Sequence, residues 1–99
     1  MRIISVRTLK EYWENPGNAD SEQPLRAWYA EVKVAQWGTH HDIKTQFHSA
    51  SVIGKNRVVF NVYGNKYKLI GAIHYGLKIV YIRFVGTHKE YKAVDARSI

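Results

Sequence analysis

The sequence predicts an α+β fold. A short opening strand and two to three helices cover one face of an antiparallel β-meander, and a short helix closes the chain. Apolar residues before Gly38 recur at three- and four-residue steps, which is the period of a helix. After Lys55 the chain changes to runs rich in Val, Ile and Phe, separated by turns that contain glycine, as strands are. A length of 99 residues with 45% hydrophobic residues is enough for one core, so we expect a single domain over residues 1–99.

The first helix is expected directly after the opening strand. The β-rich run Arg2–Val6 predicts that strand. Thr8 and Glu11 have the spacing of a capping box, which predicts a helix from there to about Glu14. The Asn-Pro-Gly-Asn run at residues 15–18 ends this helix, because proline and glycine both oppose its continuation.

A second, longer helix is predicted to begin near Asp20 or Ser21 and to close at Gly38, with Pro24 in its first turn. Its apolar stripe consists of Leu25, Trp28, Val32 and Ala35. Beyond it, Thr39 and Asp42 can cap a further short helical turn that runs through Phe47.

The second half predicts three consecutive strands, Arg57–Tyr63, Lys66–His74 and Lys78–Val85, joined as an antiparallel meander. The pair Gly64-Asn65 supplies the first turn, and Gly76 marks the second. Residues 90–97 are expected to form a short final helix.

The charge of the chain favours an anionic partner. Lys and Arg total 15 against 8 Asp and Glu, which gives a net charge of +7. From Lys55 onward the chain has nine Lys and Arg but only two acids, Glu90 and Asp95. Nucleic acid, an acidic protein and an anionic membrane all fit such an excess, and a purely solubilising charge is the fourth reading.

Several function classes are disfavoured. Cysteine is absent, which excludes disulfides and thiolate zinc sites. His40 and His41 are adjacent, a poor spacing for metal ligands, so we expect no metal and no cofactor. The chain has no apolar run of transmembrane length and no signal-peptide pattern at its start, which predicts a cytoplasmic protein without membrane association.

Strand alternation sorts the side chains of the meander onto two faces. The purer apolar set is expected to face the helices: Val58, Phe60, Val62, Tyr67, Leu69, Gly71, Ile73, Val80, Ile82 and Phe84. The other face then gathers Arg57, Asn61, Lys66, Lys68, Tyr81 and Arg83. Four cations, an amide and an aromatic ring would form a shallow trough that binds phosphates and stacks bases. An ordinary solvated face is the alternative, above all for the two lysines.

The stretch from Tyr81 to Tyr91 holds the richest chemistry. It places Arg83, His88 and Tyr91 near the end of one strand. An arginine can bind a phosphate, a histidine can move a proton near neutral pH, and a tyrosine can stack on a base. This set favours chemistry on RNA.

Five segments of the chain resemble a known family. They are residues 9–14 (LKEYWE), 22–29 (EQPLRAWY), 58–62 (VVFNV), 64–69 (GNKYKL) and 81–91 (YIRFVGTHKEY). In this order they are similar to the HigB-type toxins of bacterial type II toxin–antitoxin systems, within the RelE-like group of RNA-cleaving toxins. Many members place an aspartate after the tyrosine of the last segment, where this chain has Lys92; Asp95 is near but out of register.

The resemblance implies a compact RelE-like fold and cleavage of mRNA on the translating ribosome, which inhibits translation and growth. It also implies a cognate HigA-type antitoxin with a helix-turn-helix domain. Operator DNA would be bound only by the complex, through the antitoxin.

RNA is cleaved without a metal when its 2′-hydroxyl attacks the adjacent phosphorus. The 2′ proton must be removed, the charge on the phosphate stabilised and the 5′ leaving oxygen protonated. We assign the charge stabilisation to Arg83 and Lys68, and the proton transfer to His88. Arg57 and Lys66 are expected to hold neighbouring phosphates.

The other candidate residues are Tyr91, Asn61 and Tyr81, and the first two have more than one possible role. Tyr91 either stacks on a base or donates a proton, unless it only packs its ring on the sheet. Asn61 either orients the phosphate or a base edge, or it serves the hairpin. Tyr81 adds a stacking surface.

Two other functions fit the same residues. A basic RNA- or ribosome-binding module without catalysis needs only the cationic face and the aromatic rings. An interaction protein that recognises an acidic partner needs only the charge. DNA binding by the chain alone is weaker, because the helix near Leu25–Gln36 has balanced charge and no recognition helix follows it.

Overall fold

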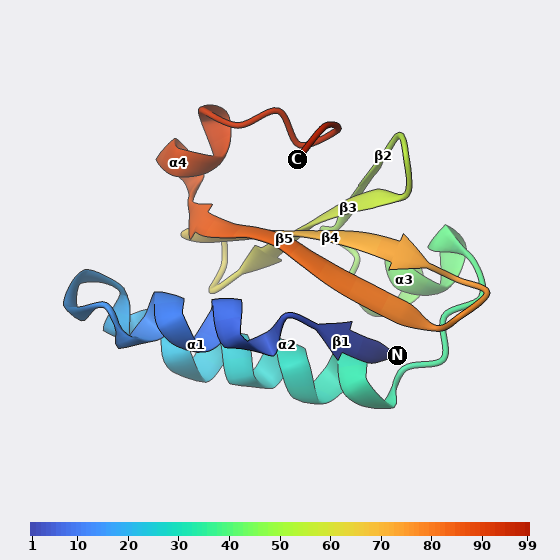
Figure 1. The fold of residues 1–99 in the computed structure, drawn as a ribbon, viewed down its shortest axis with the longest axis horizontal. Coiled ribbons are helices and arrows are strands. Elements are labelled where there is room, and N and C mark those ends of the chain that lie inside the picture. Colours follow the sequence, from blue (N-terminus) through green and yellow to red (C-terminus); the bar gives the residue numbers. More distant parts are fainter.

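The computed structural model describes residues 1–99 as two layers, with helices below a twisted sheet and a short helix above it (Figure 1). The elements in chain order are β1 (Arg2–Ile4), α1 (Val6–Glu14), the 3₁₀ helix η1 (Pro16–Ser21), α2 (Glu22–Val34), α3 (His40–Gln46), β2 (Ser51–Ile53), β3 (Arg57–Val62), β4 (Tyr67–His74), β5 (Ile79–Thr87) and α4 (His88–Lys92).

The sheet has five strands in the order β1-β5-β4-β3-β2. The β3–β4–β5 meander pairs antiparallel, as predicted, and β1 adds to its β5 edge as a parallel strand. The helices α1 and α2 lie on one face of the sheet, while α4 and the residues after it lie on the other (Figure 1). The predicted α+β class and the short final helix are therefore confirmed.

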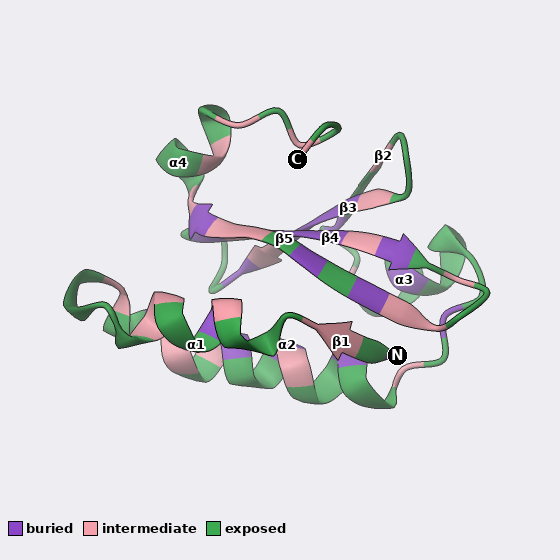
Figure 2. Ribbon diagram, in the orientation of Figure 1, coloured by how far each residue is buried: buried purple, intermediate pink, exposed green.

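The core lies between the sheet and α1, α2 and α3 (Figure 2). Phe60 of β3 is at its centre and is fully buried. Its ring centroid lies 5.4 Å from Trp28, 6.0 Å from Trp37 and 5.3 Å from Phe47. The buried stripe of α2, which is Leu25, Trp28 and Val32, is the one that the three- and four-residue steps predict.

The predicted capping box of the first helix is wrong. The helix α1 already begins at Val6, which the sequence suggested was still strand, and its N-cap is Ser5. Thr8 lies inside the first turn, where its amide donates to the Ser5 carbonyl at 3.0 Å. Strand propensity at residues 2–6 is therefore overridden after three residues.

The end of the second helix also differs from its prediction. The helix α2 stops at Val34, because Ala35 is extended, rather than at Gly38. The amino group of Met1 donates to the Val32 and Lys33 carbonyls at 3.2 Å each, so it helps to satisfy the carbonyls at the helix end, in addition to the Ala35 amide that bonds Val32 at 3.1 Å. In contrast, the cap of α3 is confirmed: the Asp42 carboxylate accepts the Thr39 amide at 3.2 Å.

The sheet is longer than the sequence predicted. The strand β2 (Ser51–Ile53), which was not predicted, pairs with β3. The strand β5 continues to Thr87, and α4 begins at His88 and ends at Lys92, earlier than the predicted helix at residues 90–97. A capping box between Thr87 and Glu90 sets this helix start.

An irregular register between β4 and β5 changes one predicted face. Ile70 pairs with Phe84 but Gly71 pairs with Ile82, so Arg83 is an extra residue without a partner on β4. Such a bulge shifts the alternation of the strand by one position. Phe84 therefore does not join Val80 and Ile82 in the core, as predicted, but lies on the opposite face.

This corrected position of Phe84 explains the need for Gly86. A Cβ on Gly86 would lie 2.5 Å from Cζ of Phe84 and 3.1 Å from Cβ of Glu90. The phenylalanine ring therefore lies over residue 86, and only a glycine there leaves room for the ring.

The two phenylalanines on opposite faces of the sheet allow a matched test of the core. We expect Phe60→Ala to lower the free energy of unfolding by about 3–5 kcal/mol, since it opens a cavity among three aromatic rings. Phe84→Ala removes the same atoms from a half-buried site and should cost clearly less. Urea unfolding followed by tryptophan fluorescence measures both. Equal losses would contradict the placement of Phe84 outside the core.

Candidate functional site

We call the face of the sheet opposite α1 and α2 the open face. Its residues lie in rows across β3, β4 and β5. The rows are Arg57–Ala72–Tyr81, Val59–Ile70–Phe84 and Asn61–Lys68–Gly86. Neighbouring rows are two residues apart along a strand, or about 7 Å. The open face thus combines cationic, amide and aromatic side chains within the span of a few nucleotides.

One group at the α4 end of the open face consists of Asn61, Lys68 and Tyr91, and we call it the lysine cluster. The Lys68 amino group donates to the Asn61 side-chain carbonyl and lies 5.8 Å from the centre of the Tyr91 ring. The Asn61 amide nitrogen in turn donates to the Ser49 carbonyl at 3.1 Å. Asn61 is therefore held between the loop before β2 and Lys68, which fixes the lysine on this face.

His88 belongs to the same end of the open face. It is exposed, and its ring centre lies 6.3 Å from that of Tyr91. The two residues are three positions apart on α4, so their side chains lie on one side of the helix. The His88 amide donates to the Lys66 carbonyl at 3.3 Å, which ties the first residue of α4 to the β3–β4 turn. The imidazole therefore lies beside Tyr91, and Tyr91 in turn lies near Lys68.

The orientation of α4 depends on Glu90. Its carboxylate accepts the Thr87 amide at 2.7 Å and the Tyr12 hydroxyl at 3.3 Å, and so connects α4 to α1. The backbone N–H of Thr87 is the main reason why the pKa of Glu90 is held below its usual value, and the bond from Tyr12 adds to it. Burial and the nearby Glu90 carboxylate together raise the pKa of Tyr12.

A second group on the open face is the arginine pair, Arg57 and Arg83. Arg57 donates through Nε at 3.1 Å and Nη2 at 2.9 Å to the main-chain oxygen of Ile99. Arg83 donates through Nε to the same oxygen at 3.4 Å. Two guanidinium groups from different strands thus converge on one acceptor. Tyr81 is exposed in the same row as Arg57.

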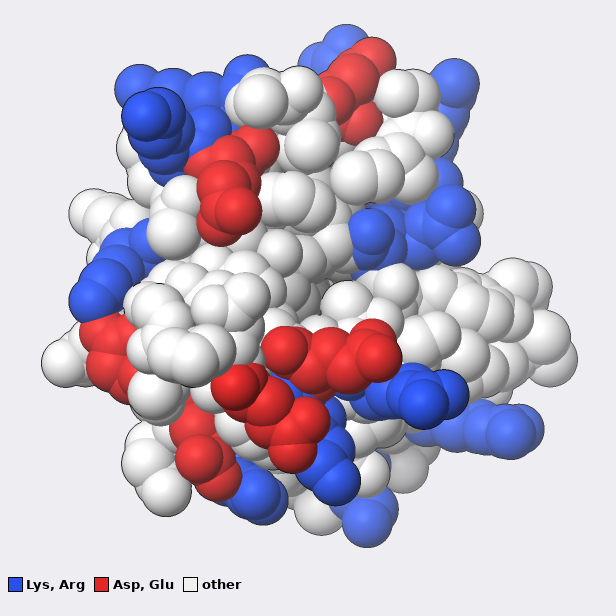
Figure 3. Space-filling model, turned by 60° about the vertical axis from the view of Figure 1, so that its left-hand side comes forward, with Lys and Arg blue, Asp and Glu red and all other residues white.

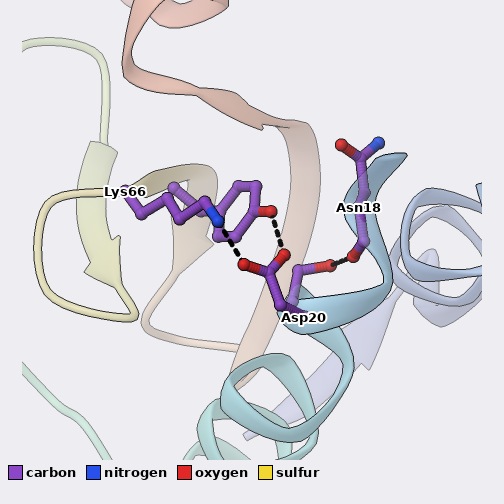
Figure 4. A network of polar contacts seen from close by, with 5 residues as sticks. Asn18, Asp20 and Lys66 are labelled. Atoms are coloured by element: carbon purple, nitrogen blue, oxygen red, sulfur yellow. Dashed lines mark hydrogen bonds and ion pairs between the residues drawn. The ribbon is translucent and has the colours of Figure 1, made fainter. Parts of the chain in front are cut away.

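Lys66 lies apart from both groups, contrary to the predicted convergence of four cations. Its amino group is paired with the Asp20 carboxylate of η1, which also accepts the Tyr67 hydroxyl (Figure 4). The bond from Lys66 is the main reason why the pKa of Asp20 is lowered. Lys66 is a turn residue that precedes β4, so alternation along the strand does not determine its direction.

The charges are divided between the layers. Six of the eight acids precede Lys44, in the helical part of the chain. On the end of the molecule shown in Figure 3, acidic side chains gather mainly in the lower half, while Lys and Arg dominate the upper corners. The same part of the chain also has five Lys and Arg, so its charges nearly balance, and the excess of positive charge lies in the second half of the chain. An anionic chain is therefore attracted more strongly to the open face than to the helical layer.

Sequence reasoning missed two features of this face. The first is Phe84, whose aromatic ring lies on this face. Phe84 and Gly86 are two residues apart on one strand, so they share a face, and this spacing could have indicated that the ring lies over the glycine. The segment around Asp95 folds back toward the arginine pair, and no local pattern predicts where it lands. The structure contains no group of three or more metal-ligating side chains that could hold a metal ion.

The open face thus holds two arginines that converge on one acceptor, a lysine, an imidazole and an exposed ring. These groups define a small basic domain suited to an anionic partner. The family comparison specifies its class. A family model, HigB_toxin, described as the RelE-like toxic component of a toxin-antitoxin system, matches residues 21–94. The chain belongs to this family, so it is the toxic component of such a system and has an antitoxin as its partner.

None of the curated proteins compared with the chain matches it. The helices are also all too short or too polar to cross a bilayer.

The depressed pKa of Glu90 predicts a pH-dependent α4. A carboxyl group whose pKa is lower in the folded state stabilises it above the unfolded-state pKa, and this contribution is lost as the pH falls through the lower, folded value. NMR titration of the Glu90 carboxyl should give a pKa below the ordinary one in the native protein. It should stay low in Tyr12→Phe, since the main cause is the Thr87 backbone. An ordinary Glu90 pKa in the native protein would refute the capping role. In Glu90→Gln, the stability of α4 should no longer depend on pH in this range.

Proposed function

We propose that this toxin is a metal-independent endoribonuclease that cleaves mRNA on the translating ribosome. The observation that supports it most is that a lysine, a phenol and an imidazole gather at one end of the open face, with a single row of residues between them and the arginine pair. The family supplies a toxic role, and the basic open face supplies a surface for RNA phosphates.

The reaction that suits these groups is a transfer of the phosphodiester to the neighbouring ribose oxygen. The 2′-hydroxyl loses its proton and forms a bond to phosphorus, while the bond from phosphorus to the 5′ oxygen breaks. The leaving 5′ oxygen takes up a proton, so the products are a 2′,3′-cyclic phosphate and a 5′-hydroxyl. DNA lacks the 2′-hydroxyl and is not cleaved.

The side chains divide this work. Lys68 and Arg83 stabilise the additional negative charge on the phosphate, where the guanidinium can donate two hydrogen bonds. His88 transfers a proton, because an imidazole side chain can serve as either acid or base in catalysis. Tyr91 is a neighbour of both the imidazole and Lys68, and it either donates a proton or stacks on a base.

Substrate binding uses the rest of the open face. Arg57 holds a phosphate next to the reacting one, and Tyr81 offers an exposed ring for a base. Asn61 orients Lys68 through its side-chain carbonyl, which makes it a positioning residue. Lys66 contributes a long-range charge, since its amino group is engaged by Asp20.

The antitoxin is proposed to be a HigA-type helix-turn-helix protein that brings the complex to operator DNA. A partner with acidic segments would complement the net charge of +7. A cytoplasmic location follows from an mRNA substrate. The neighbouring reading frame tests this proposal directly: it should encode a helix-turn-helix protein of about 100 residues, an ordinary single-domain length.

The catalytic assignment predicts the behaviour of two variants. Arg83→Ala and His88→Ala should each lower the rate of mRNA cleavage by about 10²-fold or more, the usual loss when one charge-stabilising or proton-transfer group is removed. Both should relieve growth arrest on expression. The double variant should lose less than the sum of the two effects, because the groups act on one phosphate.

Primer extension on mRNA from translating extracts, with and without chelator, measures this cleavage. Co-purification with the antitoxin shows that each variant is folded. Full toxicity in both variants would remove the assignment. RNA that is bound but left intact by the native protein, without a growth effect, would instead support the non-catalytic RNA-binding module.

Variants of the two lysines in the β3–β4 hairpin can distinguish a specific role of the lysine cluster from an effect of net charge alone. Lys68→Ala and Lys66→Ala remove the same charge, but only Lys68 contacts Asn61 and Tyr91. We expect Lys68→Ala to lower the cleavage rate at saturating mRNA. Lys66→Ala should mainly weaken binding, to a smaller extent that fades as salt rises. Identical rates for the two variants would contradict a special role of Lys68.

A further inference from the structure

The residues that follow α4 turn back over the open face (Figure 1). Asp95 organises this turn. Its side chain accepts the Arg97 amide at 3.1 Å, and its carbonyl accepts the Ser98 and Ile99 amides at 3.1 Å each. A short side chain that bonds the backbone two residues on is a common way to build a tight turn. We call residues 95–99 the strap.

The strap ends between the arginine pair. The oxygen of Ile99 is bonded by Arg57 from β3 and by Arg83 from β5, and β4 lies between these strands. The oxygen must therefore lie above β4, in the middle of the open face. Arg57 is further fixed by a bond from Nη1 to the Lys55 carbonyl at 3.0 Å.

The middle row of the open face is covered. Val59 is 4% exposed and Ile70 is fully buried, yet neither belongs to the core cluster on the helical side. They occupy the row between the arginine pair and the lysine cluster. A covering is needed on the open face to bury them, and the strap lies on that face with Ala96 and Ile99 half-buried.

We propose that the strap closes an RNA phosphate subsite formed by Arg57 and Arg83, and that RNA must displace the strap to bind. This inference rests on the proposed function, because it takes RNA as the ligand of the open face. A guanidinium that donates to the Ile99 oxygen cannot give the same hydrogen bonds to a phosphate. The strap is therefore a competitor within the chain.

Physical chemistry favours exchange over permanent closure. A phosphate presents several charged oxygens and can accept two hydrogen bonds from each guanidinium, whereas the strap offers both arginines one oxygen. The strap is also short and half-exposed, so little free energy opposes its release. The apparent affinity for RNA is then reduced by the fraction of molecules in which the strap is closed.

Loosening the strap tests the proposal. The probe is a single-stranded RNA oligonucleotide with 2′-O-methyl groups, which the protein cannot cleave, followed by fluorescence anisotropy. Asp95→Ala removes the side-chain bond to the Arg97 amide, which weakens the turn, and should raise the affinity of the full chain by about three- to tenfold, the gain expected if the strap is closed in most molecules. A chain lacking residues 95–99 should show at least the same gain. That deletion removes one acid and one base, so it leaves the net charge of the protein unchanged.

Two comparisons separate displacement from general electrostatics. Asp42→Ala also removes one carboxylate that accepts backbone amides, but it lies at α3 and should leave the affinity nearly unchanged. In an Arg57→Ala background, Asp95→Ala should give little further gain, because the strap has lost its main donor. An equal gain from Asp42→Ala and Asp95→Ala would overturn the proposal.

A direct readout follows the strap itself. In the native protein, NMR resonances of the Ser98 and Ile99 amides should sharpen and move toward random-coil positions as the oligonucleotide is added. Binding that leaves these resonances unchanged would overturn the proposal, and so would an absence of binding by both the native and the shortened chain. A failure of mRNA cleavage would refute the endoribonuclease while leaving this measurement intact, so the two failures are distinguishable.

Discussion

The single extra residue in β5 decides which side chains reach the open face. Because Arg83 has no partner on β4, the alternation of the strand shifts after it, and Phe84 joins Arg83 outside the core. The bulge lies opposite the Ile70–Gly71 step, where a side chain on Gly71 would meet Val80 at 3.1 Å. One irregularity thus adds an aromatic ring to the open face beside the arginine pair, and it returns Val85 to the core side.

The two layers of the molecule have separate electrostatic roles. Acids on the helical elements engage cations or cap backbone amides, as Asp20 does for Lys66 and Asp42 does for Gly38 and Thr39. The open face keeps its cations available to acceptors such as the Asn61 amide and the Ile99 oxygen. An excess of positive charge on one face orients an approaching polyanion before contact, and this effect weakens as salt rises.

Sequence reasoning predicted the elements and the class well, because periodicity, turn residues and proline act locally. It placed the α2 stripe, the α3 cap and the meander where the structure has them. It missed the bulge, which needs knowledge of the partner strand, and therefore misplaced Phe84. It also missed the Lys66–Asp20 pair, because the two residues are 46 positions apart. Long-range pairings of this kind have no local signal, and these pairings decide which cations of the site lie together.

The attachment of α4 has a thermal consequence. A helix of five residues is too short to persist by itself and exists only while its caps hold. The capping residue Glu90 is itself held by a hydrogen bond from Tyr12, in the helical layer. Warming should fray this peripheral turn well before the hydrophobic interior melts, so the imidazole and the phenol would scatter in a molecule that still looks native by circular dichroism. Under the proposed function, the upper working temperature of the toxin would be set by the fraying of α4 and not by the melting point of the core.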